Sequence, residues 1–224
     1  MRIHVLTLDS LQVGSIYAQE ALFDWSRKIP EAEVLAAQKF TNPKRKDEFL
    51  KGRLILHYLD RNLPPVLQSA QGMPCWPEGR VGSISHKEGL VVATVQDASH
   101  LQSIGIDIEE SSLVSLQIAG AICRQEELEF LELIPENEKK REALTIIFSG
   151  KESLFKCCYQ ICQIWFGFKD AVVTLIDHPQ NRFQIKLQRE LSPDFTIGKT
   201  FNGTFQWLNF GNRKFILTCV TYAR

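Results

Sequence analysis

The chain has 224 residues, of which 44% are hydrophobic and 23% are charged. This length suits one large domain or two small ones with a substantial buried core, and the composition is that of an ordinary globular protein. The formal net charge is zero, so no overall field favours nucleic acid or an acidic membrane surface. No apolar run approaches the roughly 18 residues that span a bilayer, and the N-terminal segment is too short and too polar for a signal peptide. We therefore expect a cytoplasmic protein with neither nucleic-acid nor membrane partners.

The first half of the chain predicts a mixture of helices and strands. Its expected elements are a strand at 2–8, short helices at 16–26 and 31–40, a helix at 43–62, a loop at 71–82, and strands at 81–85 and 90–95 around a turn at 86–89. Asn42 is the expected N-cap of the third helix, and Pro43 suits its first turn.

The second half is expected to be helical at first and then rich in strands. Its expected elements are a polar connection at 97–103, a strand at 104–110, loop and short helix at 111–120, helices at 124–133 and 139–165, and strands at 171–176, 183–187, 204–209 and 214–221. Gly211-Asn212 would turn the last hairpin.

The two halves are alike in outline. Each contains a helix in which an aromatic residue precedes a glycine and a base, as Phe49 precedes Gly52-Arg53 and Phe148 precedes Gly150-Lys151. In each half strands follow this helix. The pattern predicts a duplicated α+β unit, with a ligand site in the cleft between the halves.

The strand at 104–110 carries two carboxylates on one face. In Ile104-Gly105-Ile106-Asp107-Ile108-Glu109-Glu110 the isoleucines alternate with Gly105, Asp107 and Glu109. The Cα atoms of Asp107 and Glu109 would lie about 6.5–7 Å apart. Like charges this close favour a hard cation such as Mg²⁺ between them. The alternative is a solvated acidic face without a function.

Two further patterns concern charge. Glu152 and Lys156 are four residues apart on the long helix and share one face. Their neighbours are strongly apolar, although a surface ion pair is the alternative. Between residues 39 and 53 there are six basic residues against two acidic ones. This local cluster suggests a phosphate or another small anion, whereas a merely solvated helix face is the alternative.

Three motifs together resemble a known family. The segments Gly82-Ser83-Ile84-Ser85-His86, Gly105-Ile106-Asp107-Ile108-Glu109 and Phe148-Ser149-Gly150-Lys151-Glu152-Ser153-Leu154-Phe155-Lys156 occur in that order. They resemble the 4'-phosphopantetheinyl transferases of the surfactin- and enterobactin-synthetase type. Cys75-Trp76-Pro77-Glu78-Gly79 resembles the enterobactin branch most closely.

The resemblance implies an enzyme that transfers the 4'-phosphopantetheine arm of coenzyme A to a serine of an apo acyl or peptidyl carrier protein. The products are the holo-carrier and adenosine 3',5'-bisphosphate. The implied α+β fold is a pseudodimer of two similar halves with the active site at their interface. Residues 1–102 would form the half on the 3'-phosphoadenosine side of coenzyme A, and residues 103–224 the half with the metal-binding carboxylates and the catalytic helix. A monomer is expected from the fused halves.

The resemblance also implies roles for individual residues. By position, Mg²⁺, or Mn²⁺ in its place, would be bound by Asp107, Glu109 and Glu152. The implied catalytic residues are Glu152, which takes the proton of the attacking serine directly or through a metal-bound water, Lys156 at the leaving phosphate, and His86. The implied contacts to coenzyme A are Arg45, Lys46, Arg53, Ser85, His86 and Lys156.

One departure from the family pattern and two other functions stay open. Many relatives carry a base before the proline of the Gly-x-Pro turn, where this chain has Met73. The carboxylates could instead serve a Mg²⁺-dependent phosphohydrolase or nucleotidyl transferase, or the chain could be a non-catalytic module that binds coenzyme A. The apolar residues of segment 111–120 are a candidate surface for the carrier. The carrier itself could belong to nonribosomal peptide, polyketide or fatty-acid biosynthesis.

Overall fold

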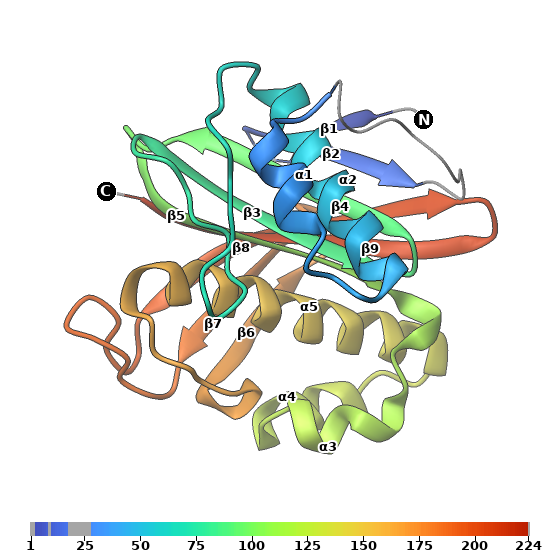
Figure 1. The fold of residues 1–224 in the computed structure, drawn as a ribbon. Helices are drawn as coiled ribbons and strands as arrows, with labels where there is room; N and C mark the ends of the chain where they lie inside the picture. The colour runs from blue at the N-terminus through green and yellow to red at the C-terminus, as the bar shows by residue number, and fades with distance from the viewer. Residues whose placement is uncertain (1–2, 9, 18–27, 224) are drawn as a thin grey trace. The chain divides into compact units, whose positions relative to one another are not determined.

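A computed structural model describes residues 3–8, 10–17 and 28–223 (Figure 1). The chain divides into two compact units, Met1–Leu101 and Gln102–Arg224. Both contain helices and antiparallel sheets, which confirms the α+β class. Among the described residues, no helix combines the length and the apolar character that crossing a bilayer requires.

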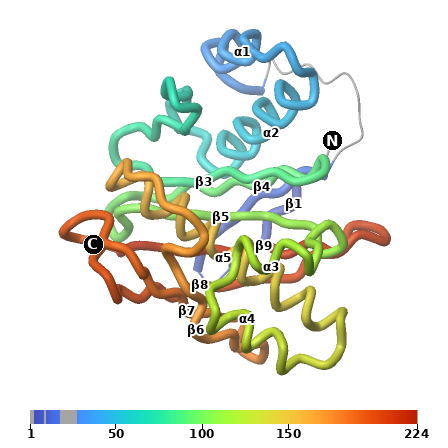
Figure 2. Tube along the Cα trace, turned by 90° about the horizontal axis from the view of Figure 1, so that it is seen from below, coloured from blue at the N-terminus to red at the C-terminus, as the bar shows by residue number. Residues whose placement is uncertain are grey.

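Among the described residues of the first unit, two helices accompany an antiparallel sheet. Its elements are β1 (His4–Leu8), β2 (Leu11–Tyr17), α1 (Glu31–Ala37), α2 (Pro43–Leu59), β3 (Arg80–Lys87) and β4 (Leu90–Asp97), with the described strands in the order β1-β2-β4-β3. Figure 2 shows α1 and α2 on one side of β3 and β4. Gly52 lets α2 approach the sheet closely, because a Cβ there would lie 3.1 Å from Ile84. As predicted, Asn42 caps α2 by accepting hydrogen bonds from two backbone N–H groups.

Three predictions for this unit need correction. Ile16 and Tyr17 end strand β2 and do not begin a helix; the rest of the predicted helix, residues 18–26, lies outside the described residues. Helix α2 ends at Leu59, three residues early. Strand β3 continues to Lys87, so the hairpin turn comprises only Glu88 and Gly89, both with positive φ.

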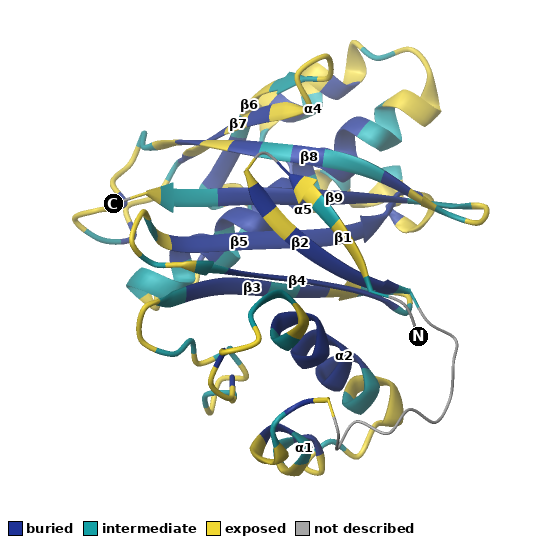
Figure 3. Ribbon diagram, turned by 90° about the horizontal axis from the view of Figure 1, so that it is seen from above, coloured by how far each residue is buried: buried dark blue, intermediate teal, exposed yellow. Residues whose placement is uncertain are grey.

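The second unit contains the long helix and a larger sheet. Its elements are β5 (Leu101–Glu110), the single turns η2 (Ser111–Leu113) and η3 (Leu116–Ile118), α3 (Ala119–Ile122), α4 (Gln125–Glu132), α5 (Asn137–Cys162), the turn η4 (Phe168–Asp170), β6 (Ala171–Asp177), β7 (Arg182–Leu187), β8 (Thr200–Phe210) and β9 (Arg213–Ala223). The described strands lie in the order β5-β9-β8-β7-β6. Figure 3 shows the buried character of β5 and of the middle of β9.

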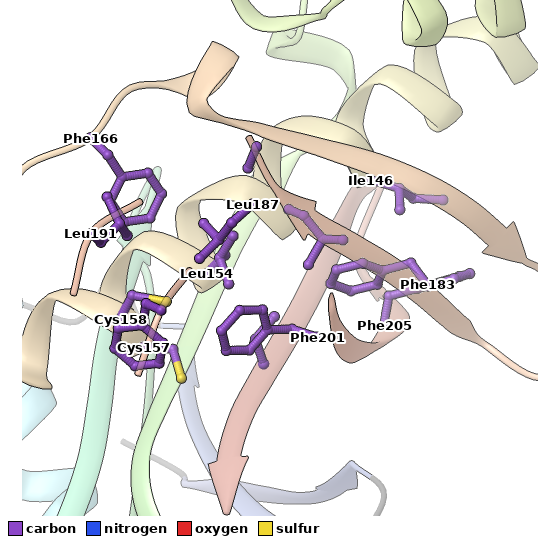
Figure 4. Packing of buried hydrophobic residues seen from close by; sticks show 14 of the residues in the cluster. Ile146, Leu154, Cys157, Cys158, Phe166, Phe183, Leu187, Leu191, Phe201 and Phe205 are labelled. Carbon is purple, nitrogen blue, oxygen red and sulfur yellow. The ribbon is translucent and has the colours of Figure 1, made fainter. Parts of the chain in front are cut away.

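Aromatic side chains fill the core of this unit. Phe183, Phe201 and Phe205 gather beside residues of α5 such as Leu154 and Ile146 (Figure 4). Two glycines make room for the Phe183 ring, since a Cβ at Gly203 would lie 2.1 Å from the ring and one at Gly150 would lie 2.9 Å from it. Gly150 in mid-helix therefore has a packing reason that offsets its low helix propensity.

The predictions for this unit err mainly at element ends. Strand β5 begins at Leu101, inside the predicted connection. Helix α5 ends at Cys162, because Gln163 adopts a left-handed conformation with φ 54°. Trp165, the last residue of the predicted helix at 139–165, follows α5 and is 70% exposed. The final hairpin turns at Gly211-Asn212 as predicted.

Candidate active site

The acidic strand β5 lies directly against α5. A Cβ on Gly105 would lie 1.9 Å from the backbone oxygen of Ser153, so only glycine allows this approach. Side chains of α5 then reach the strand: Lys156 Nζ donates to the carbonyl of Ile106 at 3.1 Å, and Gln160 Nε2 donates to that of Ile104 at 2.6 Å. The motif glycine thus determines which helical residues meet the carboxylates.

Both oxygens of Asp107 receive hydrogen bonds from α5. Lys156 Nζ lies 2.7 Å from Oδ1, and Ser149 Oγ donates to Oδ2 over 2.9 Å. Asp107 is 4% exposed, so its charge is stabilised by these partners and not by bulk water. This excludes the alternative that Asp107 is a solvated surface residue.

Glu152 lies on the same stripe of α5 as both partners of Asp107. Ser149, Glu152 and Lys156 follow one another at spacings of three and four residues, which places them one above another on a helix. Since Ser149 and Lys156 both reach Asp107, the stripe between them faces the acidic strand. Glu109 shares the face of β5 with Asp107 and is 8% exposed. Helix geometry therefore places Glu152 one turn before Lys156, which bonds Asp107, while Glu109 follows Asp107 on the same face of β5.

These donors suit a hard divalent cation. Carboxylate oxygens are the ligands that Mg²⁺ prefers, and Asp107, Glu109 and Glu152 supply them. Among the described residues no three His, Cys, Asp or Glu side chains form a ready metal cluster. Lys156 Nζ lies at Oδ1 of Asp107, so a cation bound to this oxygen would take the place of the lysine.

A chain of buried hydroxyl groups extends from Asp107 into the sheet. The Ser149 hydroxyl lies 2.8 Å from Thr218 Oγ1, which lies 2.7 Å from Ser153 Oγ. These three side chains are fully buried. None of the three is among the predicted site residues; only the position of Ser149 and Ser153 inside the helix motif could have suggested them. This row of hydroxyl groups holds the Asp107 carboxylate in its orientation through the bond from Ser149.

The lysine next to Glu152 has a structural role that its sequence motif does not predict. Lys151 Nζ donates to Glu127 Oε2 at 2.6 Å and to the carbonyl of Ile122 at 2.9 Å. Glu127 also accepts the backbone N–H groups of Arg124 and Val173. Burial lowers the pKa of Lys151, and the neighbouring Glu127 carboxylate opposes that shift. The pair connects α5 with α3, α4 and β6.

An apolar pocket of about 320 Å³ opens beside Glu152. Its walls are largely aromatic, and the residues that line it are Lys151, Glu152, Phe155, Trp165, Phe166, Gly167, Phe168 and Ala171. Glu152 therefore lines a pocket that suits an uncharged group.

The first unit contains a separate pocket of about 180 Å³, and three predicted contacts to coenzyme A lie in its wall. These are Arg45, Arg53 and His86; the other residues that line it are Phe40, Glu48, Phe49, Gln68, Gly72, Pro74 and Ile84. Of the other predicted contacts, Lys156 belongs to the second unit, and two residues of the first unit do not line the pocket. Lys46 is absent from its wall, and Ser85 lies on the face of β3 opposite to Ile84 and His86, because side chains alternate along a strand.

Arg53 is a buried cation, and one of its nitrogen donors, Nη2, has no hydrogen-bond partner among the described residues. It is 2% exposed, its Nε donates to the Val66 carbonyl at 3.0 Å, and its guanidinium lies 4.0 Å from the centre of the Phe49 ring. Its Nη2 is buried, with no hydrogen-bond partner in the described part of the chain. Burial lowers the pKa of Arg53 to about 10, which Glu33 opposes. A buried donor of this kind, at the wall of a pocket, suits an anionic ligand.

His86 lies within strand β3 and not in the predicted turn. Its Nδ1 lies 3.2 Å from Glu48 Oε2, and Glu48 is 6% exposed. Glu48 was not among the predicted site residues; its position five residues before Arg53 on the basic helix was the available signal. Its carboxylate orients the imidazole at the pocket wall.

Comparison with known proteins agrees with these features. Residues 31–96 match the model of the 4'-phosphopantetheinyl transferase N-terminal domain, and residues 103–214 match that of the 4'-phosphopantetheinyl transferase superfamily. The chain belongs to this superfamily. The resemblance expected from the three motifs is confirmed.

Several curated relatives of this superfamily are similar to the chain. The 4'-phosphopantetheinyl transferase PptT of Mycobacterium tuberculosis is 31% identical over 65% of this chain and 64% of its own length. The transferase Npt of Nocardia iowensis is 28% identical over 87% of this chain and 89% of its own. Enterobactin synthase component D of Escherichia coli is 36% identical over 66% of this chain and 68% of its own, which agrees with the predicted likeness to the enterobactin branch.

Proposed function

We propose that this superfamily member transfers the 4'-phosphopantetheine arm of coenzyme A to a serine of an apo carrier protein, in a Mg²⁺-dependent reaction. The observation that supports this most is the buried Asp107 carboxylate, which is bonded by Lys156 on the helix that carries Glu152. In the reaction the serine Oγ forms a bond to the phosphorus next to the pantetheine arm. The bond from this phosphorus to the bridging oxygen of the diphosphate breaks, and adenosine 3',5'-bisphosphate leaves.

The residues of the second unit would divide the work among them. Asp107, Glu109 and Glu152 would hold Mg²⁺, which, when bound, neutralises charge on the diphosphate. Glu152, directly or through a water, takes the proton of the serine hydroxyl. Lys156 neutralises the charge that develops on the leaving phosphate. The apolar pocket beside Glu152 suits the uncharged pantetheine arm, which is attached to the phosphorus under attack.

The first unit would bind the nucleotide end. Arg45, Arg53 and His86 at one pocket wall offer donors to a phosphate, and the buried Nη2 of Arg53 lacks a protein partner among the described residues. The pseudodimeric relation of the two halves and an active site at their interface remain predictions from the family resemblance, as do the monomeric state and the cytoplasmic location. We also propose that Met73 cannot make the phosphate contact that a base makes at this position in many relatives.

The test is intact-protein mass spectrometry of an apo carrier protein incubated with this protein, coenzyme A and Mg²⁺. We expect a gain of one phosphopantetheine group that disappears with a chelator and in Glu152→Ala. Release of phosphate from coenzyme A without modification of any carrier would favour the hydrolase or nucleotidyl transferase instead. Tight binding of coenzyme A without turnover on carriers of nonribosomal peptide, polyketide and fatty-acid synthesis would indicate a binding module.

Arg53→Ala should weaken binding of coenzyme A roughly tenfold or more, because a hydrogen bond to a charged group contributes about 1.5–3 kcal/mol. Dephospho-coenzyme A, which lacks the 3'-phosphate, should bind almost as before. Isothermal titration calorimetry measures both affinities, with the exposed Arg61→Ala as the matched control. Equal weakening of both ligands would contradict a contact between Arg53 and the 3'-phosphate.

The structure refines the candidate surface for the carrier. Leu116 is half-buried and packs against the cluster that contains Ile122, so Leu116→Asp would also disturb the core. Leu113 is 53% exposed and Ile118 is 38% exposed. We expect Leu113→Asp to raise the KM for the carrier roughly tenfold, as for an interface anchor, with the KM for coenzyme A unchanged. If steady-state kinetics show both KM values rising together, the surface is wrong.

A further inference from the structure

A fully buried carboxylate in α1 is bonded to two different parts of the first unit. Glu33 is 0% exposed. Its Oε1 accepts the backbone N–H of Val66 at 2.6 Å, and its Oε2 lies 2.8 Å from His57 Nε2 on α2. Burial of a carboxylate costs free energy unless its oxygens are hydrogen-bonded or paired, and both oxygens of Glu33 have such partners. None of the three motifs includes Glu33.

The peptide group of Val66 connects Glu33 to Arg53. Its N–H donates to Glu33, while its carbonyl accepts from Arg53 Nε at 3.0 Å. The segment that carries Val66 is therefore held from both sides. Because Nε is anchored, the outer end of the guanidinium is fixed in direction, and Nη2 stays buried at the pocket wall with no partner among the described residues.

Glu33 also supplies negative charge to a buried cation. The Coulombic effect of Glu33 raises the pKa of Arg53 against the lowering by burial. Arg45 and His86 line the same pocket wall but do not balance the charge of Arg53. Arg45 is itself a cation, and His86 is paired with Glu48. The Arg53 guanidinium thus depends on Glu33 both for its charge balance and, through Val66, for its position.

We propose that Glu33 is a positioning residue that holds Arg53 in place for a phosphate monoester of the ligand, the 3'-phosphate of coenzyme A. This rests on the proposed function. Glu33 does not line the pocket and is not expected to touch the ligand. Its effect should therefore depend on the presence of Arg53 and of the phosphate, and it should be weak for a ligand that lacks this phosphate.

The experiment measures the affinities of the full chain for coenzyme A and dephospho-coenzyme A by calorimetry. Glu33→Met removes both acceptor oxygens at similar side-chain volume and should weaken coenzyme A roughly tenfold, with dephospho-coenzyme A within about twofold. Glu33→Gln keeps one acceptor for the Val66 N–H and should give a smaller loss, and it serves as the measurement if Glu33→Met does not fold. His57→Leu removes the other contact of Glu33, because leucine has no N–H donor, and should keep the ratio of the two affinities near the wild-type value.

Combination with Arg53→Ala separates the possible outcomes. The double variant should lose no more of the preference for coenzyme A than Arg53→Ala alone, because both act through one contact. An equal loss for both ligands in the Glu33 variants would show a merely structural role and overturn the proposal. If Arg53→Ala removes the preference but the Glu33 variants keep it, only the role of Glu33 is overturned. If the wild type shows no preference for coenzyme A, the phosphate site of the proposed function fails, and this proposal with it.

Discussion

Asp107→Asn is expected to lower kcat/KM for carrier modification by about 1000-fold, the scale of losing a key electrostatic contact in a transition state. The substitution keeps the shape of the side chain, and the amide oxygen can still accept from the buried Ser149 hydroxyl. It removes the negative charge that a divalent cation needs, and also the charge that pairs with Lys156. Carrier modification measured over a range of Mg²⁺ concentrations gives the rate and its metal dependence.

The matched control for this variant is Ser153→Ala. It deletes a fully buried hydroxyl on the same helix, but this hydroxyl reaches Asp107 only through Thr218 and Ser149. We expect a small loss of stability and less than a tenfold loss of activity, by analogy with outer-shell partners of metal ligands. If the Asp107→Asn variant is folded, as judged by circular dichroism, and still turns over normally at saturating Mg²⁺, then Asp107 is not one of the proposed metal ligands.

Local periodicity was enough to predict the acidic strand and the long helix α5. The alternation at 104–110 correctly placed Gly105 and Asp107 on one face, since strand geometry depends on neighbouring residues alone. The spacing of Glu152 and Lys156 likewise follows from the helix. By contrast, the bond between Ser149 and Thr218 joins residues 69 positions apart. It exists because β9 pairs beside β5, and no local pattern contains that information.

The errors in the first unit have similar physical causes. Strand β2 was missed because Val13, Gly14, Ser15 and Ile16 are all buried, so the segment shows no alternation of polar and apolar residues. His86 was placed in a turn because the polar run after Ser85 resembles a loop, whereas the two-residue turn at Glu88-Gly89 leaves the histidine in the strand. Arg53 can be buried because its Nε donates to the carbonyl of Val66, in the segment after α2. The basic face of a helix does not predict this contact.

Loss of the buried pair formed by Lys151 and Glu127 should be the largest stability effect in the second unit. Removing one partner of a buried pair leaves an uncompensated charge and costs about 3–5 kcal/mol. Lys151→Met leaves Glu127 with the two backbone N–H groups that it also accepts. Glu127→Leu leaves the Lys151 charge and both of these N–H groups without their acceptor. We therefore expect Glu127→Leu to be the more destabilising of the two.

The double variant Lys151→Met/Glu127→Leu should be more stable than the sum of the single losses predicts, because neither charge is left alone. Urea unfolding of each variant gives the free energies of unfolding that the comparison needs. The control is Lys139→Met on the same helix, which breaks only the exposed contact with Glu136 and should cost less than about 1 kcal/mol. A wild-type free energy of unfolding in Lys151→Met would show that the pair does not hold α3, α4 and β6 to α5. If the pair does hold them, Glu152, the proposed metal ligand and base, depends on a structural lysine one residue away, and the motif Lys151-Glu152 combines support with the proposed chemistry in adjacent positions.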